Sequence, residues 1–157
     1  MEQSTSGISK ADEALASFKS GFSCSQAVLS GFSEELGMDK KTACRVSCGF
    51  GAGIARTGNV CGAVSGAIMV IGLKYGKATV EDNPAREKTY ALVQEFIHDY
   101  TALHGSISCP DLLGYDISDP AQFREAQEKK VATKIRPELT RDAVLVLEHV
   151  FAKHEGA

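Results

Sequence analysis

The fold is decided by one stretch of the chain, residues 61–75, which reads CGAVSGAIMVIGLKY. Almost every position in it is apolar or small, so a helix formed by these residues has no polar face and must be buried on all sides. Gly76 follows in the position where helices commonly end. The small residues in the first half allow a neighbouring backbone to come close. We therefore expect a buried central helix over 61–75.

Apolar residues recur at helical spacing on both sides of this stretch, and cap residues mark where the segments begin. Ser9, Ser23 and Asp39 are suited to begin helices, and Pro137 is suited to the first turn of the last one. No segment alternates apolar and polar residues over the length of a strand. The fold class is therefore predicted as all-α, a compact bundle of about six to seven helices around the central one. The predicted helices are 9–20, 24–36, 40–49, 61–75, 83–104, 120–131 and 137–153.

The length and charge of the chain exclude several classes of protein. Its 157 residues are the size of one domain, and we expect a disordered N-terminus over 1–7 and a single all-helical domain over 8–155. The formal net charge is −3 without a basic cluster, which argues against nucleic-acid binding. The longest apolar run, 63–73, is shorter than the about 20 residues of a membrane-spanning helix, and no signal-peptide pattern begins the chain. We expect a soluble, cytoplasmic protein with no membrane insertion.

A glycine-rich segment, residues 49–59, precedes the central helix. Four glycines lie within it, which predicts a loop whose backbone needs positive φ or a close approach to another group. The segment follows a helix rather than a strand, so it does not match a dinucleotide-binding loop. Loop amides next to a helix N-terminus suit an anion or a small ligand. The candidate cofactor-binding residues are Gly51, Gly53, Arg56 and Gly62.

The chain has five cysteines, and none of them forms a C-x-x-C pair. This spacing argues against a thioredoxin-type site, a zinc knuckle and a covalently attached c-type haem. Two of the five are four residues apart on one predicted helix, a spacing that can chelate a metal but that also suits small core residues. The five cysteines are Cys24, Cys44, Cys48, Cys61 and Cys109.

Cys61 is the most informative of the five because it lies where the glycine-rich segment turns into the central helix. The free N–H groups and the positive dipole end of a helix stabilise an anion, so we expect a lowered pKa for this thiol, with Arg56 adding positive charge. Cys24 begins another helix and falls on its apolar face, where it can meet Cys61. Cys109 is expected in an accessible loop, directly before Pro110.

Three segments, in this order, resemble the redox-active protein family named for its CGAxxG motif. They are FSCSQAVL at 22–29, GFGAGI at 49–54 and CGAVSGA at 61–67. The resemblance extends over roughly 8–152. In that family an early cysteine and the motif cysteine are followed by two later ones.

The family pattern assigns Cys24, Cys61 and Cys109 to its first three cysteines. Arg136 stands where the fourth is normally found. The resemblance implies redox or metal chemistry at clustered thiols and no known substrate or redox partner. Either Cys61 attacks and Cys24 or Cys109 resolves a reversible disulfide, or the three thiols hold zinc or an iron–sulfur cluster.

A metal site built on this pattern is one ligand short, because Arg136 cannot act as a thiolate donor. Cys44 or Cys48 is a candidate to replace the missing ligand. A second class of function stays open beside the redox one: a non-catalytic helical binding or adaptor module with structural cysteines. In that module, expected to be a homodimer, the small-residue helix 61–75 packs a subunit interface or a ligand. Native-state thiol reactivity separates the two, because filler cysteines react only after denaturation.

Overall fold

The computed structural model describes residues 7–155, and the described chain is all-α, as predicted. The predicted disordered N-terminus lies outside the described residues except for Gly7. The α-helices are α1 (Lys10–Ser20), α2 (Cys24–Ser33), α3 (Lys40–Ser47), α4 (Gly51–Arg56), α5 (Gly62–Tyr75), α6 (Asn83–His104), α7 (Cys109–Leu113), α8 (Pro120–Glu128) and α9 (Val131–Glu155), with short 3-10 helices η1 (Glu34–Leu36) and η2 (Cys48–Phe50).

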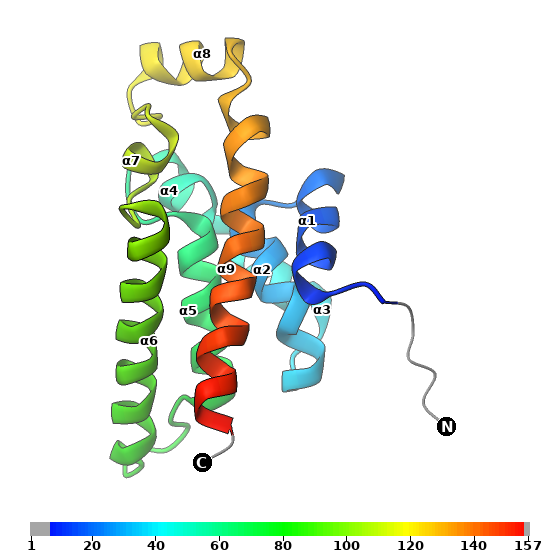
Figure 1. Ribbon diagram of the computed structural model, residues 1–157, viewed down its shortest axis with the longest axis vertical. Helices are drawn as coiled ribbons and strands as arrows, with labels where there is room; N and C mark the ends of the chain where they lie inside the picture. The colour runs from blue at the N-terminus through cyan, green and yellow to red at the C-terminus, as the bar shows by residue number, and fades with distance from the viewer. Residues whose placement is uncertain (1–6, 156–157) are drawn as a thin grey trace.

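Helix α5 is the predicted central helix. Figure 1 shows it between α6 and α2 and behind α9, and it contacts all three of these helices. Val64, Ala67 and Ile71 are fully buried within the core. A Cβ added at Gly66 would lie 2.8 Å from the carbonyl oxygen of Ser25 in α2, so the small residues of α5 serve a close approach within this chain. They therefore give no support to the predicted subunit interface.

Local signals located most helix starts correctly. The side chain of Ser9 accepts a hydrogen bond from the Asp12 amide at the start of α1. Ser23 forms a reciprocal capping box with Gln26 at the start of α2, which satisfies two amides that have no partner inside the helix. Asp39 caps α3 in the same way as Ser9 caps α1. Because each cap acts within three residues, the sequence alone reveals it.

The prediction that Pro137 opens the last helix is wrong, because α9 begins at Val131 and Pro137 lies inside it. Proline has no amide hydrogen, so the carbonyl of Thr133, four residues earlier, receives no helical hydrogen bond from it. Helix α7 was not predicted at all, since five residues are too few to show a helical period.

The glycine-rich segment was predicted to be a loop with positive φ, and its positive φ is confirmed. The structure forms a left-handed helical turn here, in which Ala52, Gly53, Ile54 and Ala55 have φ between 52° and 70°. Only one of these four is glycine, and Arg56 continues the turn with φ 66°. A left-handed conformation costs a residue with a side chain roughly 1–2 kcal/mol. The turn is therefore a strained element that the surrounding packing must hold.

Candidate functional site

The main chain brings Cys61 and Cys109 together. An isolated antiparallel bridge joins the segment before α5 to the segment before α7. Across it, the Cys61 amide donates to the carbonyl of Ile107 at 2.8 Å, and the Cys109 amide donates to the carbonyl of Asn59 at 2.9 Å. Side chains alternate between the two faces of such a pair, so Cys61 and Cys109 are diagonal neighbours on one face. Two residues 48 positions apart in the sequence thus share a site.

Cys24, the first residue of α2, is the third thiol of the site. All three cysteines are at most 5% exposed. They line a chamber of about 10 Å³, which is close to the space that a single water molecule needs. The walls of this thiol chamber are Cys24, Ala52, Gly53, Cys61, Gly62, Cys109, Leu112, Leu113, Arg136 and Leu139. The structure therefore brings together the three cysteines that the family pattern selects.

The candidate cofactor-binding glycines are in close contact with protein atoms. A Cβ added at Gly53, where φ is 70°, would lie 2.6 Å from the Cβ of Cys109. Added Cβ atoms at Gly51 and Gly62 would lie 2.8 Å from a side-chain carbon and 3.1 Å from a carbonyl oxygen, respectively. Packing alone therefore explains why these positions lack side chains. Gly53 and Gly62 border the thiol chamber, and their role in cofactor binding stays a prediction.

Burial controls the acidity of the three thiols. It raises the pKa of Cys24 to about 12, and it also raises the pKa values of Cys61 and Cys109. The Ala63 and Val64 amides at the start of α5 do act on the Cys61 thiol to lower its pKa, as the helix N-terminus predicted. Desolvation of the thiolate is the larger effect. The predicted lowering of the Cys61 pKa is therefore wrong in sign.

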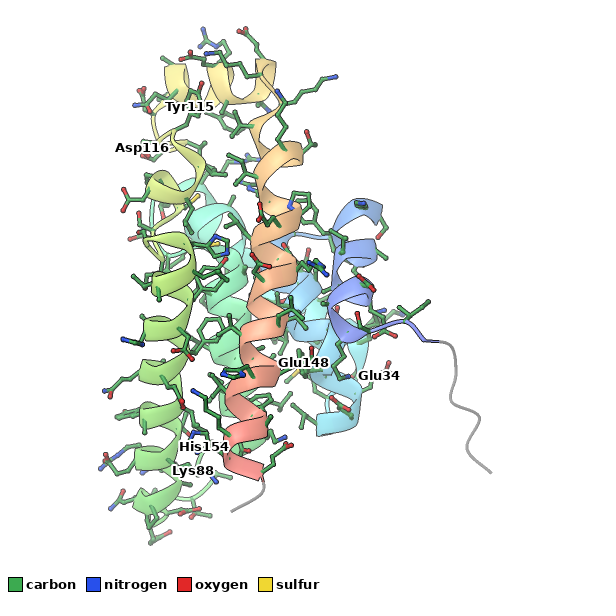
Figure 2. The ribbon with its side chains drawn as sticks, viewed as in Figure 1. Glu34, Lys88, Tyr115, Asp116, Glu148 and His154 are labelled. Carbon is green, nitrogen blue, oxygen red and sulfur yellow. The ribbon has the colours of Figure 1, made fainter. Side chains whose placement is uncertain are left out.

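Arg136 supplies the positive charge that was expected from Arg56. The half-buried Arg136 lines the chamber together with Cys109, and its charge acts to lower the pKa of each thiol in the chamber. Arg56 is exposed and lies over the ring of Phe123, 4.9 Å from its centroid. The negative charge of Asp116, which Figure 2 shows beyond α7, raises the Cys109 pKa and so opposes Arg136.

Two hydroxyl side chains complete the surroundings of the thiols. The fully buried Tyr100 donates a hydrogen bond to the carbonyl of Leu139 at 3.1 Å, and its hydroxyl group acts to lower the pKa of the nearby Cys61 thiol. Thr140 of α9 donates its hydroxyl hydrogen to the Arg136 carbonyl at 2.9 Å, and it acts to lower the pKa of the nearby Cys24 thiol. Neither residue could be placed at the site from the sequence, because Tyr100 and Thr140 lie on the apolar faces of α6 and α9 among ordinary core residues. Burial raises the pKa of Tyr100 strongly, so this phenol stays protonated.

The residues of the site do not fit a zinc ion or an iron–sulfur cluster. Within residues 7–155, no three His, Cys, Asp or Glu side chains are placed to hold a metal ion. Cys44 is half-buried on α3 and Cys48 is exposed, and neither lines the chamber, so neither replaces the missing ligand. The Arg136 guanidinium among the thiols repels a cation in addition. All five cysteines are free thiols in the structure.

Comparison with known proteins identifies the family of the chain. The family model described as "Putative redox-active protein (C_GCAxxG_C_C)" matches residues 22–150. No curated protein and no solved structure matches the chain. Among the described residues, no helix is both long and apolar enough to cross a membrane. The match includes every residue that lines the thiol chamber, and the chain belongs to the redox-active family C_GCAxxG_C_C.

Proposed function

We propose that the chain transfers electron pairs by forming and reducing a disulfide between Cys109 and Cys61. One observation carries this proposal: the bridge before α5 and α7 places Cys61 and Cys109 on one face, where both side chains line the thiol chamber together with Arg136. A guanidinium charge beside a sulfur stabilises the thiolate, which is the form that attacks a disulfide. The metal alternative has less support, because a cation would have to share the chamber with Arg136.

The proposed reaction is a thiol–disulfide exchange with an oxidised partner that carries a disulfide. The Cys109 thiolate attacks one partner sulfur, the partner disulfide breaks, and one partner thiolate leaves. The Cys61 thiol then loses its proton and attacks the Cys109 sulfur of the mixed disulfide. The Cys61–Cys109 disulfide forms and the second partner thiolate leaves. Two protein thiols are oxidised by two electrons, and one partner disulfide is reduced to two thiols.

This assignment differs from the interpretation of the sequence, in which Cys61 attacks. At Cys109 the Arg136 charge is the largest of the effects that lower the pKa, whereas at Cys61 it comes after two backbone amides, so we assign the attack to Cys109 and the resolving step to Cys61. Cys24 has a pKa of about 12 and stays protonated at neutral pH. Its proposed role is that of a neutral thiol beside the disulfide.

The redox function has more support than the adaptor function, in which the cysteines are core filler. A guanidinium beside buried thiols is costly to desolvate and adds nothing to a filler role. An apolar side chain at Arg136 would fill that space with less loss of stability. A homodimer and a cytoplasmic location are not needed for the proposed reaction and stay predictions.

The test is to oxidise the reduced protein with an excess of a small disulfide and to map the product by mass spectrometry. The expected product is an intramolecular Cys61–Cys109 disulfide. Cys61→Ser is expected to stop at the mixed disulfide on Cys109, and Cys109→Ser to slow the first step strongly. Cys44→Ser is the matched control, because Cys44 lies outside the chamber. A protein that oxidises equally well in both chamber variants would contradict the proposal.

A further inference from the structure

A large groove lies beside the thiol chamber. Its volume is about 910 Å³, within the range of roughly 300–1,000 Å³ that small-molecule sites occupy. The end of α1, the strained turn α4, helix α8 and the start of α9 form its walls, and Figure 1 shows α8 and the start of α9 at the same end of the molecule. Its apolar lining includes Phe18, Phe22, Leu113, Ile117, Phe123 and Val131.

The charges of the groove all have one sign. Lys19, Arg56, Lys130 and Arg136 line it, and no Asp or Glu does, although acidic residues outnumber basic ones in the chain. In the part of the chain that the structure describes, none of these four cations has a carboxylate within ion-pair distance. Unpaired charges of one sign in a concave, apolar surface attract a ligand of opposite charge. The groove therefore suits an anion with an apolar body.

The groove and the thiol chamber share part of their walls. Ala52, Leu113 and Arg136 line both spaces. Arg136 is the one long, flexible side chain among them, and it lines the chamber together with Cys109. A ligand anion that pairs with the Arg136 guanidinium is therefore held at the wall between the groove and the Cys109 thiol.

Backbone strain gathers along the same groove. Five non-glycine residues of the described chain have positive φ, and Ala52, Ala55, Arg56 and Lys130 among them line the groove. Strained backbone is retained mainly where the surrounding structure holds it for a function. The strain lies along the groove as well as beside the thiol chamber, which supports a function for the groove.

We propose that the groove binds a small organic disulfide that carries a carboxylate on an apolar body. Arg136 pairs with the carboxylate, the other cations of the groove attract it, and Cys109 attacks the bound disulfide. The electron balance is that of the exchange given above: the organic disulfide becomes two thiols as Cys61 and Cys109 become a disulfide. The inference names a substrate class for the dithiol site and therefore rests on the proposed function.

The test compares two aromatic disulfides of similar size. Dithiobis(nitrobenzoate) carries a carboxylate on each ring, and dithiodipyridine carries none at neutral pH. The rates of both reactions are measured on the reduced protein with Cys44→Ser and Cys48→Ser, so that only chamber thiols react. We expect the rate ratio of the anionic to the neutral probe to fall about tenfold in Arg136→Gln and several-fold in Arg56→Gln. The matched control Lys134→Gln, an exposed cation outside the groove, keeps the ratio.

The ratio separates charge recognition from thiol reactivity, because Arg136→Gln also removes the positive charge beside Cys109 and slows both probes. Added salt should lower the rate of the anionic probe alone. A ratio that is the same in all variants would overturn the groove proposal, even if mass spectrometry finds the Cys61–Cys109 disulfide. Absence of that disulfide with either probe would overturn the proposed function itself. Arg56→Gln, an exposed change, keeps the test decisive if Arg136→Gln does not fold.

Discussion

The two ends of the helix bundle differ in how their helices are held together. Near the end of α9, ion pairs link this helix to α6, whereas at the opposite end the helices enclose uncharged thiols. Glu95 of α6 lies 3.1 Å from Lys153 and 2.8 Å from His154, which Figure 2 shows near the end of α9. At the other end, Cys24 and Cys61 are buried beside a strained left-handed turn. The ion pairs of Glu95 contribute a small stabilisation, as surface ion pairs commonly do. The strained turn lowers stability, so the thiol end is the one that needs a functional explanation.

The two ends are also expected to respond to pH in opposite directions. Burial raises the pKa of Cys24, so the thiol end loses stability as pH rises. The ion pairs lower the pKa of Glu95, so the charged end loses stability as pH falls. Separate measurements at alkaline and acid pH can therefore test each end without the other.

The largest expected effect is alkaline destabilisation through Cys24. Its thiol loses a proton near the ordinary value of 9.0 in the unfolded chain and at about 12 in the folded one. The stabilising effect of the bound proton is complete below pH 9 and is lost as pH rises toward 12, by on the order of 4 kcal/mol. Urea unfolding of the reduced protein at a series of pH values measures it.

Cys24→Ala is the matched variant for this measurement, because alanine keeps the site small and cannot ionise. Its free energy of unfolding should fall less steeply above pH 9 than that of the unchanged protein. Equal slopes in the two proteins would mean that Cys24 does not titrate as a buried thiol.

The second effect compares two glycines on α5. Gly66→Ala places a Cβ 2.8 Å from the carbonyl oxygen of Ser25, so α2 and α5 must separate and the free energy of unfolding should fall by about 1–3 kcal/mol. Gly72→Ala meets nothing within 4 Å, and it should raise that free energy by up to about 1 kcal/mol. Thermal unfolding of both variants measures the pair. An equal loss of unfolding free energy in both variants would contradict the close packing of α5 against α2 at Gly66.

The third effect uses one substitution in two backbone conformations. Ala55→Gly removes a side chain from a residue with φ 52°, and we expect a gain in stability of up to about 1 kcal/mol. Ala91→Gly, in the right-handed helix α6, should instead lose about 1 kcal/mol. Both alanines are exposed, so packing contributes little to either change. Opposite signs in denaturant unfolding confirm the strain, and equal losses would contradict it.

The helices could be predicted from the sequence because their signals are local. The cap at Ser23 and the apolar run of α5 act within a few residues, and both predictions are confirmed. Pro137 was interpreted wrongly because proline favours a first turn, yet its helix had already begun six residues earlier. The left-handed turn could be predicted as positive φ but not as a turn, because residues other than glycine supply most of it.

The site was predictable only in part, because its geometry depends on distant contacts. The pairing of Cys24 with Cys61 came from two helix starts and the resemblance to a family, and only that resemblance joined Cys109 to them. The bridge that aligns two of them is too short to show a strand pattern. In the sequence, Arg136 only marks the position where the family's fourth cysteine is absent. The packing of α9 against the chamber shows that Arg136 lies beside the thiols.

The smallest expected effect returns to the charged end. Hydrogen bonds from His154 and Lys153 hold the pKa of Glu95 below its ordinary value. The stabilisation is therefore present above that ordinary value and is lost as pH falls through the lower, folded-state pKa. Because the groups are solvent-exposed, Glu95→Gln should cost at most about 1 kcal/mol at neutral pH and flatten the dependence on acid. Glu148→Gln, which removes an exposed carboxylate with no ion pair among the described residues, is the matched control. If both variants lose the same small amount of unfolding free energy, the ion pairs of Glu95 add no stability. The contrast between the two ends would then rest on the strained turn and the buried thiols alone.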